Sequence, residues 1–306
     1  MPFYTGEEIF NSSTIKPKRM VINFFDRDYE ESCLYSEAFS IVESKVKPVR
    51  EKVRRKAHRE KWWQFGDKRP ALYEKLNNLD RAIVQTRHTK HLCPQIVDTG
   101  VVFSDSMVVF PSDSYWLYAI LNSFIHDAWA RETSGTIRTE LRYSHTDCFY
   151  TFPLPPEDEE LSDLGVQLDE IRCKVKKSRL CSINDVMDFI NDQSDESEEV
   201  AFLREIHKRI DARMCELYGW KNFNIDHQFY RVGERDRFYI SESQLADVKH
   251  QLLELNLAFT GNNTKAEKSK GEKTPVSYGR TSIKNLSLDE LSEFKPQLDI
   301  FGQEGE

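Results

Sequence analysis

Hydrophobic positions in the first half of the chain cluster into short runs bounded by turn-forming residues. Met20–Phe25 (MVINFF), Arg81–Arg87 (RAIVQTR) and Pro94–Val97 are rich in apolar and β-branched residues, which predicts short strands. Val101–Phe103 and the MVVF run at 107–110 predict a hairpin around an SDS turn. Tyr115–Ala130 has apolar residues at nearly every helical position and predicts a buried helix.

A long amphipathic helix is expected over Tyr29–Arg59. Phe39, Val42 and Val46 recur at spacings of three and four residues, whereas Pro48 predicts a kink or a break. The opposite face of this helix is basic. This pattern is expected of a helix that lies along DNA phosphates, and it is equally typical of an ordinary surface helix packed on a core.

The second half of the chain is dominated by helical periodicity. Four stretches carry apolar residues at helical spacing: Leu161–Lys177, Ile183–Asn191, Val200–Tyr218 and Leu245–Leu257. Gly219 follows the third of them, where a helix C-cap is expected.

Composition shifts divide the chain into three parts. The proline cluster FYTFPLPP at 149–156 closes the first part, and the Lys-, Ser- and Gly-rich stretch Gly261–Gly279 predicts a disordered linker. We therefore predict an α+β protein: a mixed α/β domain over 1–155, a mainly α-helical domain over 156–260, and a flexible tail over 261–306.

Charge is strongly segregated along the chain. Lys45–His91 holds 15 Lys and Arg against 5 Asp and Glu, a local charge of +10; because the whole chain carries −8, the remainder carries −18. This asymmetry indicates a polyanion-binding face, or a solvated helix surface. Six scattered cysteines, and the lack of a secretory signal or an apolar run of membrane length, suit a cytoplasmic protein with reduced thiols.

Signatures of enzymes are mostly missing. The sequence has no glycine-rich phosphate loop, no H-E-x-x-H and no G-x-S-x-G, and its histidines lack metal-ligand spacing. One alternative is a Mg²⁺-dependent nuclease that uses Asp28, Glu43 and Lys45, two carboxylates for the metal and a lysine for a water. That chemistry needs Glu43 and Lys45 on a strand, but they fall in a helical pattern.

The nucleic-acid signal has two components. Phosphate contacts need exposed cations without sequence preference, and the basic run supplies Lys52, Arg54, Arg55, Lys56, Arg59 and Lys61. Base contacts need forked or hydroxyl side chains on a structured loop, and 131–144 supplies Arg131, Ser134, Thr136, Arg138, Glu140, Arg142 and Ser144. The second stretch is also what a polar loop that caps the preceding helix would contain.

Several motifs occur here in a characteristic order. They are YTGEEIFNSS (4–13), RMVINFFDRD (19–28), KWWQFGDKRPALYEKL (61–76), RAIVQTRHTKH (81–91), DSMVVFPSD (105–113) and SGTIRTELRYSHTDCFYTFPLP (134–155). In this order the chain resembles the target-recognition domain of MmeI-like adenine DNA methyltransferases. LREIH (203–207), YGW (218–220), RFYIS (237–241) and LLELN (252–256) resemble the helical C-terminal part of the same enzymes.

The resemblance implies a non-catalytic DNA-specificity module of a restriction–modification or phage-defence system. The enzymes' S-adenosylmethionine loop (F-x-G-x-G) and adenine motif (N-P-P-[YF]) are missing here, so cofactor and chemistry would belong to a partner methyltransferase chain. A separately encoded subunit, the C-terminal piece of an interrupted gene, and a truncated remnant that only docks on a protein all remain open. By motif position, Arg69, Arg87 and Lys90 would contact the DNA backbone or support the scaffold, and the pair Trp62–Trp63 would mainly form core.

The tail carries a separate pattern. Its residues Gln297, Leu298, Asp299, Ile300 and Phe301 resemble the pentapeptide that bacterial replication-associated proteins insert into the sliding clamp. Docking of this stretch on the chain's own helical domain is the alternative.

Overall fold

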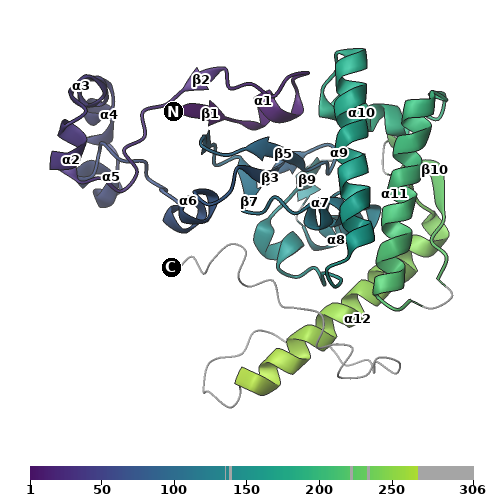
Figure 1. Ribbon diagram of the computed structural model, residues 1–306. Helices are drawn as coiled ribbons and strands as arrows, with labels where there is room; N and C mark the ends of the chain where they lie inside the picture. Colours follow the sequence, from purple (N-terminus) through teal and green to yellow (C-terminus); the bar gives the residue numbers. More distant parts are fainter. Residues whose placement is uncertain (135, 138–139, 221–222, 233–234, 268–306) are drawn as a thin grey trace.

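Small sheets occupy the middle of the molecule, with long helices on one side and a group of short helices on the other (Figure 1). The computed structural model describes residues 1–267 apart from 135, 138–139, 221–222 and 233–234. The mixture of helices and mostly antiparallel strand pairs confirms the predicted α+β class. The predicted tail lies outside the described residues from 268 onward, including the pentapeptide at 297–301.

Three sheets of three short strands lie in the first half of the chain. The first has the order β2-β1-β6, with β2 at Arg19–Met20, β1 at Pro2–Tyr4 and β6 at Val102–Phe103. The second is antiparallel, with β5 at Gln95–Asp98, β3 at Arg81–Thr86 and β7 at Met107–Phe110. The third, which we call the reading sheet because it carries several of the predicted base-reading residues, joins β4 at His88–Thr89, β9 at Glu140–Arg142 and β8 at Thr136–Ile137.

Two strand predictions are wrong in ways that have a physical cause. β6 and β7 form no hairpin, because β6 pairs in parallel with β1 while β7 pairs with β3. Each strand thereby pairs with a partner distant in sequence. The strand predicted over Met20–Phe25 includes only Met20, since Phe24 turns into a different hydrophobic cluster and Phe25 has a positive φ of 51°.

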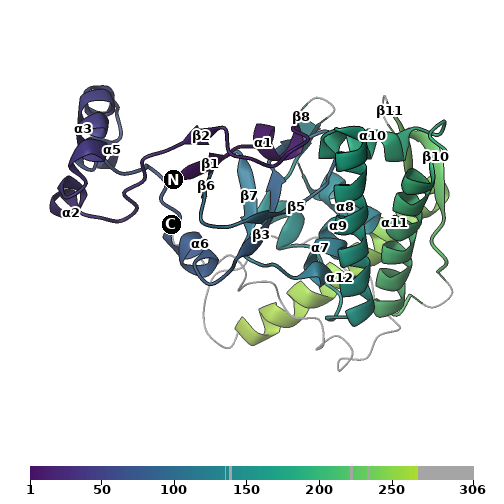
Figure 2. The same ribbon diagram turned by 45° about the horizontal axis from the view of Figure 1, so that its top comes forward.

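Short helices form a separate unit, which we call the basic lobe (residues 22–64). They are α2 (Tyr29–Cys33), α3 (Ser36–Lys45), α4 (Lys47–Arg50) and α5 (Lys56–Glu60), and they stand apart from the sheets in Figures 1 and 2. The lobe has its own core of Phe24, Phe39, Val42 and Trp62. The helix predicted over Tyr29–Arg59 is divided into these four short helices. The break predicted at Pro48 is confirmed, because α3 ends at Lys45 and Pro48 occupies the first turn of α4, where its missing N–H costs nothing.

The buried helix predicted over Tyr115–Ala130 is two helices. α7 spans Tyr115–Leu121 and α8 spans Phe124–Thr133. The side-chain oxygen of Ser123 accepts a hydrogen bond from the N–H of His126, which caps α8 and starts a new helix axis. Three short elements complete this half of the chain: α1 (Gly6–Phe10), α6 (Pro70–Leu76) and the π-helical turn η1 (His145–Phe149).

The remaining elements form what we call the helical segment. They are α9 (Glu159–Arg179), α10 (Ile183–Asn191), α11 (Glu198–Leu217), the antiparallel pair β10 (His227–Val232) and β11 (Arg235–Ile240), and α12 (Glu242–Glu267). The four predicted helices are confirmed, with ends that agree within a few residues except that α12 continues well beyond Leu257. Gly219 has φ of +68° after α11, as a C-cap requires. α12 continues to Glu267, so the predicted linker does not begin at residue 261.

One hydrophobic core joins the sheets to the helical segment. It contains strand residues such as Ile83 and Phe110 together with helix residues such as Leu168 and Ile210, all 0% exposed. At Gly165, a Cβ atom would collide with the carbonyl oxygen of Tyr115, so α9 approaches α7 as closely as only glycine allows. No helix in the described part of the chain is both long and apolar enough to span a membrane.

Candidate nucleic-acid interface

The reading sheet offers one polar face to solvent. Thr89 pairs with Leu141 and both are buried, whereas His88 pairs with Arg142 and both are exposed. Because side chains alternate along a strand, Glu140 lies on the same face of β9 as Arg142. Neither side chain makes an ion pair or a hydrogen bond with another residue that the structure describes. This face therefore presents a forked donor and a carboxylate acceptor to solvent.

The predicted base-reading residues are distributed over four elements. Arg131 lies in α8, Ser134 is the C-cap of α8, Thr136 begins β8, Glu140 and Arg142 lie in β9, and Ser144 precedes η1. Arg138 lies outside the described residues. The sequence suggested a polar loop here, but the structure forms antiparallel strands, with Thr136 opposite Leu141.

Arg131 differs from the others because its side chain is turned inward. Its Nε donates to Oδ2 of Asp127 at 2.7 Å, and the two side chains are 20% and 7% exposed. The attraction of Asp127 raises the pKa of Arg131 despite its burial, and Arg131 in turn lowers the pKa of Asp127. Both groups are thus charged, and this pair holds the last turn of α8. A role for Arg131 in base reading stays a prediction.

Buried polar contacts of Tyr143 fix the C-terminal end of β9. The hydroxyl of Tyr143 lies 2.9 Å from Nε2 of His126 inside the core. The N–H of Tyr143 donates to the carbonyl of Arg87 at 2.7 Å, and the N–H of Arg87 donates to the carbonyl of Ser106 at 2.8 Å. The exposed side chain of Arg87 accordingly starts from a fixed backbone beside the reading sheet.

The basic lobe carries the phosphate-contact candidates Lys52, Arg54, Arg55 and Arg59, all of them exposed. Arg59 also donates to the carbonyls of Val53 and Arg54 at 2.8 and 2.7 Å, which braces the loop between α4 and α5. Trp62 is 7% exposed and packs edge-on against Trp63, which confirms that the pair belongs mainly to the core. The cations therefore project from a surface that has its own hydrophobic support.

Arg69 and Lys90 are phosphate-contact candidates whose side chains lie near carboxylates. Arg69 is 12% exposed, lies near Asp67 and lines a cavity of about 270 Å³ between residues 65–69 and the strands β1 and β6. Lys90 binds both carboxylate oxygens of Asp188, at 2.5 and 2.8 Å. A phosphate contact by Lys90 would have to compete with that ion pair.

The residues of the alternative nuclease site serve structural roles. Asp28 caps α2 in a capping box with Glu31. Glu43 and Lys45 lie in α3, and Glu43 pairs with Lys47 at the start of α4. The strand geometry that this chemistry needs is replaced by a helix. Within the described residues, no group of three or more His, Cys, Asp and Glu side chains is arranged to hold a metal ion.

Sequence reasoning missed three residues around the reading sheet. His88 faces solvent beside Arg142, while Asp188 and Arg237 bind the segment that follows β4. A charged residue in an apolar stretch, as Asp188 is in DVMDFI, was the one available signal. The contacts that Asp188 and Arg237 make could not be predicted, because they join parts of the chain that are distant in the sequence.

A polar sheet face and a separate cationic lobe on one chain are features that a target-recognition module, a class of protein that reads DNA, requires. Residues 1–156 match the family model described as the target recognition domain of MmeI. The chain belongs to this family, which confirms the resemblance deduced from its motifs. No curated protein matches the chain.

A solved structure has a similar fold over a wider range. It is the Type IIL restriction-modification enzyme MmeI in complex with DNA, with a TM-score of 0.59 and 17% sequence identity. The similarity covers 85% of this chain and therefore includes much of the helical segment. It covers 31% of the MmeI chain, so this chain spans about a third of that enzyme's length.

Proposed function

We propose that this chain selects the DNA sequence for an adenine-N6 methyltransferase and has no catalytic activity alone. The observation that carries the proposal is the exposed face of β9 within an MmeI target recognition domain, where Arg142 and Glu140 lack internal partners among the described residues. Arginine suits guanine O6 and N7, and glutamate suits cytosine N4. Arg138 and Ser144 extend the same set of base-reading candidates.

The basic lobe supplies affinity without sequence preference in this proposal. Lys52, Arg54, Arg55 and Arg59 neutralise phosphates, and Arg87 adds a contact next to the reading sheet. The methyl donor S-adenosylmethionine and the pocket for the flipped adenine belong to a partner methyltransferase. The similarity in fold to MmeI bound to DNA supports duplex DNA as the ligand.

Two substitutions separate base reading from phosphate binding. Arg142→Ala should weaken binding to the preferred duplex by about 1–3 kcal/mol and relax specificity at one position. Arg55→Ala should weaken binding to every duplex alike and reduce the slope of log Kd against log salt by about 1. Lys174→Ala, which removes an exposed cation of α9, is the matched control and should change neither quantity.

The assay is a selection from a randomised duplex library, followed by fluorescence anisotropy on the selected and the scrambled duplex over a range of NaCl concentrations. The full chain is tested alone and with its candidate methyltransferase partner. Indistinguishable behaviour of the Arg142 and Arg55 variants would remove the distinction between the two surfaces. Methyl transfer by the isolated chain would contradict the non-catalytic role.

We further propose that the tail binds the bacterial sliding clamp through Gln297–Phe301. Leu298, Ile300 and Phe301 would fill the apolar pocket of the clamp, in the manner of a peptide in a groove. A peptide of residues 291–306 should bind purified clamp, and a variant with Leu298→Ala and Phe301→Ala should not. Equal binding of the two peptides would exclude this contact.

A further inference from the structure

Two stretches of chain flank the reading sheet. Side chains of the helical segment contact the first directly and reach the second through Asp127 of α8. Lys90 and His91 directly follow β4, and Arg131 lies in the last turn of α8, shortly before β8. The position of the sheet in the molecule thus depends on these two junctions as well as on its own few hydrogen bonds. Strands of two or three residues are marginally stable by themselves.

Asp188 on α10 holds the first junction. Its Oδ1 lies 2.8 Å from Nε2 of His91, and its two oxygens accept the bonds from Lys90. His91 is 3% exposed, so this contact reaches into the interior. A carboxylate from the helical segment therefore fixes the end of β4.

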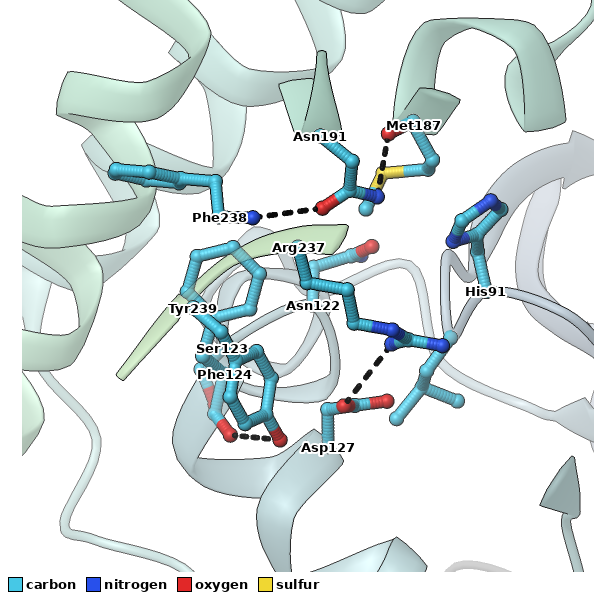
Figure 3. Close-up of a pocket in the computed structure, with 11 residues that line it drawn as sticks. His91, Asn122, Ser123, Phe124, Asp127, Met187, Asn191, Arg237, Phe238 and Tyr239 are labelled. Atoms are coloured by element: carbon cyan, nitrogen blue, oxygen red, sulfur yellow. Dashed lines mark hydrogen bonds and ion pairs between the residues drawn. The ribbon is translucent and has the colours of Figure 1, made fainter. Parts of the chain in front are cut away.

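Arg237 on β11 bridges both junctions. Its Nη2 donates to the carbonyl of Lys90 at 3.2 Å, and its Nη1 lies 4.0 Å from Oδ2 of Asp127. The same carboxylate oxygen receives Nε of Arg131. Figure 3 shows the guanidinium of Arg237 between Asp127 and the segment that carries His91. Arg237 thus joins the end of β4 to the end of α8 through one side chain, which is 9% exposed.

β11 is itself anchored on two helices, so Arg237 starts from a fixed backbone. The N–H of Phe238 donates to Oδ1 of Asn191 on α10 at 3.1 Å. The hydroxyl of Tyr239 donates to the carbonyl of Phe124 at the start of α8, at 3.4 Å. Figure 3 shows both contacts on either side of Arg237.

We infer that Arg237 is a positioning residue for sequence recognition: with Asp127 it locks the reading sheet in the geometry that base contacts require. The inference rests on the proposed function. A functional constellation has to be held within about 0.5 Å of its productive geometry, and buried partners provide that precision. Because Arg237 is buried, it does not act through phosphates, and its loss should affect discrimination between sequences rather than the salt-dependent part of the affinity.

The test compares the full chain with Arg237→Met, Arg237→Lys and the isosteric Asp127→Asn. The preferred duplex comes from selection with the unmodified chain, and Kd is measured for that duplex and a scrambled one. Arg237→Met and Asp127→Asn should reduce the ratio of the two Kd values by about tenfold, the order of one lost base contact. The slope against log salt should not change, and Arg237→Lys should restore part of the ratio because it keeps a cationic donor.

Arg213→Met is the matched control. Arg213 on α11 pairs with Asp158, the N-cap residue of α9, at 2.6 Å. Its loss therefore removes an ion pair but changes neither junction of the reading sheet. Circular dichroism and thermal unfolding verify the fold of each variant. Should Arg237→Met unfold, Asp127→Asn carries the test from the α8 side.

The outcomes separate this inference from the proposed function. Unchanged discrimination in folded Arg237→Met and Asp127→Asn, with a discriminating unmodified chain, overturns the inference alone. An equal loss in Arg213→Met also overturns it, because general destabilisation would then explain the effect. A chain that enriches no sequence contradicts the proposed function, and the inference falls with it.

Discussion

The buried contact between His126 and Tyr143, the residue that follows β9, should make the free energy of unfolding decrease at acidic pH. His126 is 0% exposed, and burial lowers its pKa from 6.5 to about 3, although Asp127 acts in the opposite direction. The folded protein therefore keeps this imidazole neutral at pH 5. In the unfolded chain, the same imidazole gains a proton below about pH 6.5.

The sign and size of the effect follow from proton linkage. Because the unfolded chain binds a proton that the folded chain excludes, the free energy of unfolding decreases as the pH falls from 6.5 toward 3. One pH unit corresponds to about 1.4 kcal/mol in this window. Between pH 7 and pH 5, His126 should therefore reduce the free energy of unfolding by about 2 kcal/mol.

Urea unfolding at pH 7 and pH 5 measures this contribution when the chain is compared with the double variant His126→Phe/Tyr143→Phe. Both side chains are replaced because His126→Phe alone would leave the Tyr143 hydroxyl buried without its partner, at a cost of about 1–3 kcal/mol. Other groups titrate in both proteins, so they cancel in the difference. The stability gap between the two proteins should shift by about 2 kcal/mol in favour of the variant at pH 5. A gap that stays constant between the two pH values would refute the reasoning.

Three further predictions address other parts of the molecule. Asp188→Asn frees Lys90 for a phosphate and should tighten binding to a scrambled duplex while raising the salt slope by about 1, and it should also reduce discrimination between sequences because the carboxylate no longer fixes the end of β4; anisotropy measures both. Gly165→Ala would force a Cβ against the carbonyl oxygen of Tyr115 and should cost about 1–3 kcal/mol in urea unfolding. Trp62→Ala removes the largest side chain of the basic-lobe core, worth about 3–5 kcal/mol, so limited proteolysis should cleave within residues 22–64 first.

The helical segment could be predicted from the sequence because its signals are local. α10 has the predicted bounds, Ile183–Asn191. It is preceded by the N-cap residue Ser182, whose side chain forms a capping box with Asp185. α9 and α11 repeat buried residues over many turns. A period of 3.6 residues sustained over such lengths determines both the type of element and its buried face.

The strand pairing of the first half could not be predicted from the sequence, because its strands are short and pair with strands that are distant along the chain. β1 pairs with β6, which lies about a hundred residues later in the sequence, and no local turn specifies that pairing. The break between α7 and α8 did have a local signal, since Ser123 is a good N-cap within an otherwise apolar run. At the candidate site, residue types indicated Glu140 and Arg142, but their shared face depends on the pairing of β9 with β4.

The reading sheet separates the residues that face a ligand from those that determine its position. In β9, Leu141 enters the core while Glu140 and Arg142 on either side of it face solvent. Substitutions at the two exposed positions remove no buried contact, whereas from the interior Tyr143 holds the end of β9 and Arg237 holds the end of β4. Since the strands are too short to fix their own position, these anchors have to do so. Exposed side chains of β9 can thus be exchanged at little cost in stability, and a change in recognised sequence is expected to arise there rather than at the anchors.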